Sequence, residues 1–123
     1  CGMPVFNAGD FVTARKMAQR NIAAFRRANV DAIVVSCSSC GLALRREYKQ
    51  LLEVGGFGVP VYEITEFLVD VIGLNDELHP VPLRVTYHDP CHLNRGLGIR
   101  EQPRTLLRMI PELEFVEMED ADR

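Results

Sequence analysis

The sequence predicts an α/β fold with a mainly parallel sheet, and two observations lead to this prediction. Short apolar runs typical of strands alternate along the chain with longer segments of helical periodicity. The first of these runs, residues 31–35, is apolar almost throughout, as expected for a strand buried on both faces of a parallel sheet. Parallel strands need a crossover connection between them, and a helix usually supplies it.

The first half of the chain is expected to hold two helices and two strands. A helix capped by Asp10 is predicted over residues 9–31, because apolar residues recur there at steps of three and four. A second helix should run from about residue 38 to 54 and end at the GGFG stretch, and a strand should follow at 59–64. The residues expected to face inward from the two helices are Phe11, Ala14, Ala18, Ile22, Phe25, Leu44, Tyr48, Leu51 and Leu52.

The second half repeats the alternation of helices and strands. Thr65 should cap a short helix over 65–73, and the proline-containing stretch 73–82 is typical of a linker. Pro103 suits the first turn of a helix over 103–110. Strands are expected at 83–88 and 113–118, with a weak helix between them at 92–99. The whole pattern favours a layered, Rossmann-like arrangement.

Composition limits the class of protein. With 123 residues the chain forms one domain or two small halves that share a core. A net charge of −3 leaves no basic footprint for nucleic acid, and no apolar run approaches the roughly 20 residues of a membrane span. Because the chain begins Cys-Gly without a methionine, we expect it to be part of a longer protein. We also expect no signal peptide, because the first residues lack a basic segment followed by an apolar one, and we therefore expect a cytoplasmic location.

The cysteines are placed where parallel sheets bind ligands. Cys37 follows the predicted strand 31–35, Cys91 follows the strand 83–88, and Cys1 precedes the first helix. Strand-to-helix crossings lie at the carboxyl edge of an open parallel sheet, which is the edge that carries ligand sites. Four cysteines in a cytoplasmic protein indicate metal binding or thiol chemistry more than structural disulfides. The pattern therefore predicts thiols gathered at one sheet edge.

Cys37 and Cys40 form a C-x-x-C pair at the start of a helix. The partial positive charge of a helix N-terminus favours thiolate, which is the form that both metal binding and disulfide exchange require. A spacing of two residues lets both sulfurs bind one metal. A lone C-x-x-C is a weak signal, and two inert buried thiols are the alternative.

Cys91 lies in the segment YHDPCHLNRG, between His88 and His92. Taken alone, Cys91 would be a small buried hydrophobe more often than a ligand. Two histidines that bracket a cysteine, with Asp89 between them, raise the prospect of a functional site. The Asp89-Pro90 pair is expected to fix the turn that aims Cys91.

These motifs together resemble the CCG cysteine-rich domain family, in which a Cys-Cys-Gly motif precedes a C-x-x-C pair and the pattern is usually present twice. The opening Cys1-Gly2 resembles the end of a first CCG motif, and 35 residues separate Cys1 from Cys37, as the family spacing requires. The stretch YHDPCHLNRGLGI resembles the start of a second repeat. The resemblance implies that residues 1–74 end the first repeat, 75–82 link the repeats, and 83–123 begin the second.

The resemblance also implies a function. Relatives include the glycolate oxidase iron-sulfur subunit, the lactate-utilisation iron-sulfur protein and the cysteine-rich subunit of heterodisulfide reductase, which transfer electrons within oxidoreductase complexes. It implies a [4Fe–4S] or non-cubane iron-sulfur cluster, or zinc in some members. Partners would be a flavoprotein dehydrogenase and other subunits, which could hold the protein at the inner face of the membrane. The segments DPCHLNRGLGI and EITEFLVDVIG resemble the hydroxy-acid branch of the family more than they resemble the methanogen reductases.

By the same resemblance Cys1, Cys37 and Cys40 would ligate a first metal site, and Cys91 would belong to a second. His88 and His92 would surround that second site without binding the metal directly. Neither repeat is complete in this sequence, since the cysteines expected before Cys1 and after residue 123 are not part of it.

Two other functions remain open from the residues alone. A strand, a C-x-x-C pair and a helix in succession also occur in thiol–disulfide oxidoreductases, although the chain has no tryptophan, which active sites of the thioredoxin type carry. A zinc-stabilised binding module could use Cys1, Cys37 and Cys40 with one histidine, because zinc prefers four closed ligands. Iron, zinc and a dithiol differ in their optical spectra, so the three hypotheses can be separated.

Overall fold

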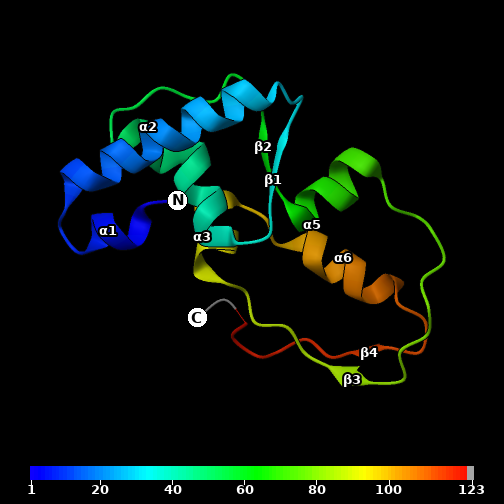
Figure 1. Ribbon diagram of the computed structural model, residues 1–123. Coiled ribbons are helices and arrows are strands. Elements are labelled where there is room, and N and C mark those ends of the chain that lie inside the picture. Colours follow the sequence, from blue (N-terminus) through cyan, green and yellow to red (C-terminus); the bar gives the residue numbers. More distant parts are fainter. Residues whose placement is uncertain (122–123) are drawn as a thin grey trace. The chain divides into compact units, whose positions relative to one another are not determined.

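The computed structural model describes residues 1–121. Its helices and short parallel strands give a mixed α/β chain (Figure 1), as the sequence predicts. The chain divides into two compact units, Cys1–Glu63 and Ile64–Arg123, here called unit 1 and unit 2. None of the helices described is both long and apolar enough to cross a bilayer.

Unit 1 is built from two long helical segments and one pair of strands. Its elements are α1 (Met3–Asn7), α2 (Phe11–Ala28), β1 (Ile33–Val35), α3 (Ser38–Leu42), η1 (Ala43–Glu47), α4 (Tyr48–Gln50) and β2 (Val61–Glu63). The three elements α3, η1 and α4 follow one another without a break, so they form one helical segment whose middle is π-type. β1 and β2 pair in parallel, with Ile33 opposite Val61.

Helix α2 begins where the sequence predicts. Asp10 is its N-cap, and the Asp10 carboxylate accepts a hydrogen bond of 2.9 Å from the backbone N–H of Thr13. Ala14, Ala18 and Ile22 are buried along one face of α2, which confirms the predicted periodicity. The short helix α1, which precedes α2 and packs against it, was not predicted.

The remaining core of unit 1 comes from the second helical segment and the strands. Leu44, Tyr48 and Leu52 are buried together with Ile33 and Val61. Phe57 joins this cluster, and its ring lies 5.5 Å from that of Phe25 and 5.9 Å from that of Tyr48.

Four local predictions for unit 1 are wrong. The second helical segment ends at Gln50 rather than near residue 54, and Leu51 just beyond it is exposed. Phe11, the first residue of α2, is also exposed, although its ring lies 5.0 Å from that of Phe6. β1 is not buried on both faces, since Val34 is 39% exposed in a sheet of only two strands.

Unit 2 contains shorter elements. They are α5 (Ile64–Glu66), η2 (Phe67–Ile72), β3 (Arg84–Val85), η3 (His92–Leu97), α6 (Glu101–Met109) and β4 (Glu114–Phe115). β3 and β4 pair in parallel, with Arg84 opposite Glu114. Thr65 lies inside the helix that it was predicted to cap, because that helix already begins at Ile64. Pro103 lies in the first turn of α6, as predicted.

The two units share an order of elements. Each has a strand, then a cysteine, then helical structure, then a second strand parallel to the first. The described strands thus form two separate pairs instead of the single sheet that the sequence led us to expect. Each strand is two or three residues long and pairs with a strand of its own unit.

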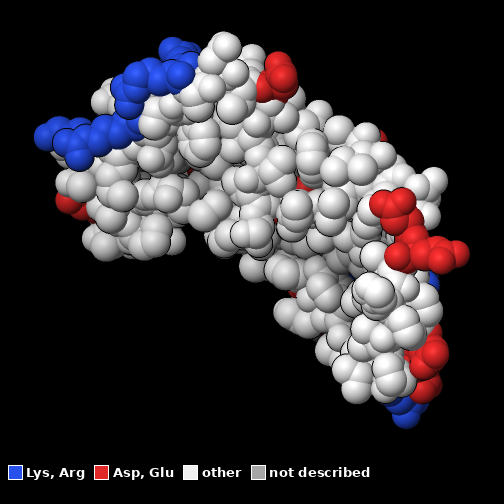
Figure 2. All heavy atoms as spheres, turned by 45° about the vertical axis from the view of Figure 1, so that its right-hand side comes forward, with Lys and Arg blue, Asp and Glu red and all other residues white. Residues whose placement is uncertain are grey.

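The units also differ in charge. Unit 1 carries eight Lys or Arg side chains and five Asp or Glu, whereas unit 2 carries six and twelve. Figure 2 shows a cluster of basic side chains over α2. The overall charge of −3 therefore conceals a basic unit 1 and an acidic unit 2.

Candidate functional site

Cys37 lies between the end of β1 and the start of α3. It is the N-cap of α3, with an extended backbone at φ −122°. Its side chain makes no capping hydrogen bond to the helix, but the backbone N–H groups of Cys40 and Ser39 and the side chains of both residues lie near enough to favour its thiolate form. The N–H of Cys40 is the main cause that lowers the pKa of Cys37 below its ordinary value. The structure therefore supports the predicted thiolate character of Cys37.

Cys40 has the opposite tendency, because burial raises the pKa of its thiol, and its S–H donation to Cys37 raises it further. The pair thus combines a thiol of lowered pKa, Cys37, with a thiol of raised pKa, Cys40, which donates a hydrogen bond to it. All four cysteines of the chain are free, so the pair is a dithiol in this structure.

We expect Cys37 to be alkylated at lower pH than Cys40 in metal-free, reduced protein. Only the thiolate reacts, and the N–H donors stabilise it at Cys37 while burial opposes it at Cys40. Iodoacetamide labelling across pH, read site by site by mass spectrometry, measures the two profiles. Cys37→Ser serves as the control for peptide assignment, and equal profiles for the two cysteines would contradict the expectation.

Two consecutive hydrogen bonds hold the backbone of Cys1 in place. The hydroxyl of Tyr48 donates to the backbone carbonyl of Cys1 at 2.8 Å, and the side-chain amide of Asn21 donates to the Tyr48 oxygen at 2.8 Å. Tyr48 is only 1% exposed, and burial raises the pKa of its hydroxyl, so it stays a donor. Neither Tyr48 nor Asn21 was predicted to have this role, because no local motif marks a contact across 47 residues.

Cys1 and Cys40 line one cavity of about 260 Å³ in unit 1. The other residues around it are Asn21, Phe25, Val35 and Leu44. Two of the three cysteines predicted for the first metal site therefore meet at this cavity, and the third, Cys37, is hydrogen-bonded to Cys40.

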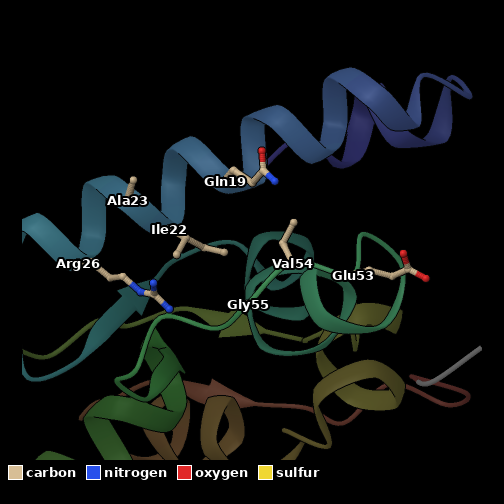
Figure 3. Close-up of a pocket in the computed structure, with 7 residues that line it drawn as sticks. All are labelled: Gln19, Ile22, Ala23, Arg26, Glu53, Val54 and Gly55. Atoms are coloured by element: carbon tan, nitrogen blue, oxygen red, sulfur yellow. The ribbon is translucent and has the colours of Figure 1, made fainter.

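A roomier cavity of about 360 Å³ lies between α2 and the loop that follows the second helical segment (Figure 3). Its lining is polar and aliphatic, with Gln19, Arg26 and Glu53 among its residues, and includes neither cysteine nor histidine. Its size alone does not make it a thiol or metal site.

Cys91 lies in unit 2, at the N-terminal end of η3. Its side chain is exposed, and so are the flanking His88 and His92. Asp89, in contrast, is buried, and its backbone N–H donates to the carbonyl of Ala121 at 2.9 Å. The turn before Cys91 is thus anchored at Asp89, in keeping with the expected role of this residue.

The partner of Asp89 is a buried arginine that the sequence analysis did not single out. Arg104 in α6 is 2% exposed and binds both Asp89 oxygens, at 2.8 and 3.0 Å. On its other side it donates to both oxygens of Glu117, with the closest contact at 2.7 Å. No local sequence signal marks Arg104 for this role.

The predicted metal ligands are brought together only in part. Among residues 1–121, no group of three or more His, Cys, Asp or Glu side chains is placed to hold a metal ion. The donor chemistry nevertheless suits iron or zinc, because the nearby N–H groups lower the pKa of Cys37 and Cys40 lies beside it. Further ligands would have to join these two.

Comparison with known proteins bears directly on these cysteines. The model of the CCG cysteine-rich domain matches residues 1–45 and 85–123, two stretches that contain all four of them. The chain belongs to the CCG cysteine-rich domain family. The resemblance inferred from the motifs is thereby confirmed, and the unmatched residues 46–84 include the predicted linker at 75–82.

The CCG chain has clear relatives in archaea and bacteria. It is 41% identical over 119 residues to an uncharacterized iron-sulfur protein of Methanocaldococcus jannaschii, covering 97% of the chain and 23% of that protein. Lactate utilization protein A of Oceanobacillus iheyensis is 35% identical over 130 residues, which covers 96% of the chain and 50% of the relative. A third relative, one of the subunits of the dihydromethanophenazine:CoB–CoM heterodisulfide reductase of Methanosarcina barkeri, is 34% identical over 127 residues, with coverages of 97% and 30%.

The CCG chain therefore spans between about a quarter and a half of these relatives. No solved structure matches it. The identities do not separate the hydroxy-acid branch from the methanogen reductases, since lactate utilization protein A is 35% identical to the chain and the heterodisulfide reductase subunit 34%.

Proposed function

We propose that the CCG chain forms part of an iron-sulfur subunit that transfers electrons within an oxidoreductase complex. In this proposal Cys1, Cys37 and Cys40 contribute ligands to one cluster, and Cys91 contributes to a second. The observation that carries the proposal is that the three cysteines lie close together. Cys37 lies beside Cys40, and Cys40 lines the same cavity as Cys1. The names of the relatives, which include an iron-sulfur protein, support it.

An iron-sulfur cluster, [4Fe–4S] or non-cubane, would supply one-electron chemistry when bound. The chain's own residues would determine how easily it is reduced. The N–H groups near the sulfur of Cys37 would reduce the electron density at that ligand, because donors around a ligating sulfur tune the reduction potential. Tyr48 and Asn21 would hold Cys1 in place. His88 and His92 would lie around the second site without binding its metal.

The complex is proposed from the relatives. One belongs to a heterodisulfide reductase and another is a lactate utilization protein, so either a heterodisulfide or a 2-hydroxy acid fits the proposal. A flavoprotein dehydrogenase subunit would be the partner that exchanges electrons with the cluster. We place the complex in the cytoplasm, or at the inner face of the membrane through partner subunits.

We further propose that each strand pair belongs to a larger, Rossmann-like layered sheet in the full-length protein. Val34 of β1 and Leu83 beside β3 are 39% and 60% exposed, so apolar surface next to both pairs is available for further packing. The repeat boundaries 1–74, 75–82 and 83–123 stay part of this proposal. The stretch 46–84, outside the family match, supports a connection between repeats in that part of the chain.

The test is the iron, sulfide and zinc content of the full-length protein, purified without oxygen, together with its visible spectrum. We expect iron and sulfide in matching amounts in the wild type. Cys37→Ser should remove the iron of one cluster, because it deletes the sulfur that the N–H groups prepare. Ser36→Ala, a neighbouring exposed position, is the matched control and should keep wild-type iron.

Two results would replace the proposal with another function. One tightly held zinc per site with no iron would indicate a zinc-stabilised binding module. Absence of metal, with Cys37 and Cys40 cycling between dithiol and disulfide, would indicate a thiol–disulfide oxidoreductase.

A further inference from the structure

A buried ion network lies beyond the carboxyl ends of the two strands of unit 2. Asp89 follows β3, Glu117 follows β4, and Arg104 comes from α6, the helix between the strands. The Arg104 side chain is 3% exposed and the Asp89 side chain 1%. One guanidinium thus binds both segments that leave the strand pair at its carboxyl edge, which is the edge where parallel sheets bind ligands.

The polar groups of this network all have hydrogen-bond partners. Besides binding Asp89 and Glu117, Arg104 donates at 2.8 Å to the carbonyl of Arg100, and its guanidinium lies 5.6 Å from the centre of the Tyr87 ring. No buried side-chain N or O atom in the described part of the chain lacks a hydrogen-bond partner. Arg104 therefore contacts both Tyr87 and Asp89 in the turn that leads to Cys91.

Fold stability alone gives little reason for such a network. Well-packed apolar residues of similar volume often match or exceed the stability of a buried ion pair, because taking charges out of water is costly. A planar guanidinium does offer directional bidentate bonds that a point charge or an apolar group does not. Its particular contribution is geometric, since it fixes two backbone segments relative to each other.

We infer that Arg104 is a positioning residue of the second thiolate site. It holds the turn 87–89 against the segment that follows β4, and so fixes the direction in which Cys91, two residues after Asp89, presents its sulfur. This inference rests on the proposed function, because it takes Cys91 as a cluster ligand. It assigns Arg104 a role through Asp89 and no direct contact with the metal.

Geometry and charge can be separated by substitution. Arg104→Lys keeps the positive charge but loses the fork that joins Asp89 to Glu117. Glu117→Gln leaves the pair of Arg104 and Asp89 intact and changes a side chain that is 47% exposed, so it perturbs folding least. Arg84→Lys alters an exposed ion pair in the same unit, 3.1 Å from Glu114, and is the matched control.

The experiment uses full-length protein purified without oxygen in two backgrounds. Cys37→Ser removes the first site, so the remaining iron reports the second, and Cys91→Ser does the reverse. Iron release to the chelator ferrozine is then timed in each background. In the Cys37→Ser background we expect Arg104→Lys to release iron about 10-fold faster, the usual scale for groups that orient metal ligands. Glu117→Gln should act in the same direction, and Arg84→Lys should have no effect.

The Cys91→Ser background decides whether the effect is specific. A role limited to general stability would speed iron release from both sites, whereas a positioning role leaves the first site at its wild-type rate. Unchanged release from the second site in both Arg104→Lys and Glu117→Gln overturns the inference while the proposed function stands. Wild-type protein without iron overturns the proposed function itself, and loss of all iron in Cys37→Ser alone overturns the inference of a separate second site.

Discussion

Arg104→Met is expected to lower the free energy of unfolding by about 3–5 kcal/mol. Methionine fills much of the same volume, so the loss does not come from a cavity. It comes from Asp89, whose side chain is 1% exposed and would lose the two bonds of 2.8 and 3.0 Å. Breaking a buried pair from one side leaves an uncompensated charge, which costs far more than losing both partners.

Urea unfolding at neutral pH, followed by far-UV circular dichroism, measures this effect. Arg84→Met is the control, because its ion pair with Glu114 is largely exposed and should contribute less than about 1 kcal/mol. The double variant Asp89→Asn with Arg104→Met should lose less than the sum of the single variants, since the two residues interact. A loss below about 1 kcal/mol for Arg104→Met would mean that water reaches Asp89, contrary to the burial described.

Tyr48→Phe is expected to destabilise unit 1 by about 1–3 kcal/mol. The ring and its packing against Phe57 remain, so only the hydroxyl is tested. Its removal leaves the carbonyl of Cys1 without its donor and the amide of Asn21 without its acceptor. Under the proposed function the same change should loosen Cys1 and speed iron release from the first site only.

Asn21→Ala is the informative comparison for Tyr48→Phe. It removes the outer bond of the chain but leaves the bond of 2.8 Å between Tyr48 and Cys1. We therefore expect Asn21→Ala to affect iron release from the first site less than Tyr48→Phe does, as measured with the ferrozine assay in the Cys91→Ser background. Equal iron release in wild type and Tyr48→Phe would show that Cys1 is not held by this hydroxyl.

Several elements of the fold followed from local sequence. The cap at Asp10 and the buried face of α2 were predicted correctly, because both depend on residues within a few positions of one another. The parallel pairing within each unit followed from the alternation of strands and helices. The π-type middle of the helix at 43–47 was not predicted, since no residue pattern of the sequence marks it.

In the candidate site, too, the local features could be predicted from the sequence and the long-range contacts could not. The place of Cys37 at a helix N-terminus, where the pKa of its thiol is lowered, could be predicted from the sequence, because a strand end, a C-x-x-C pair and a helical periodicity are all local. The family was also readable from the cysteine spacing and the YHDPCH segment.

Only the tertiary structure decided which residues support the cysteines. Tyr48 reaches Cys1 across 47 positions, and Arg104 reaches Asp89 and Glu117 across 15 and 13. In the sequence Tyr48 was one inward-facing aromatic residue, and Arg104 was one more charge on a helix. Burial removes the competing bonds with water, so the partner that packing brings within reach determines what each of these groups does.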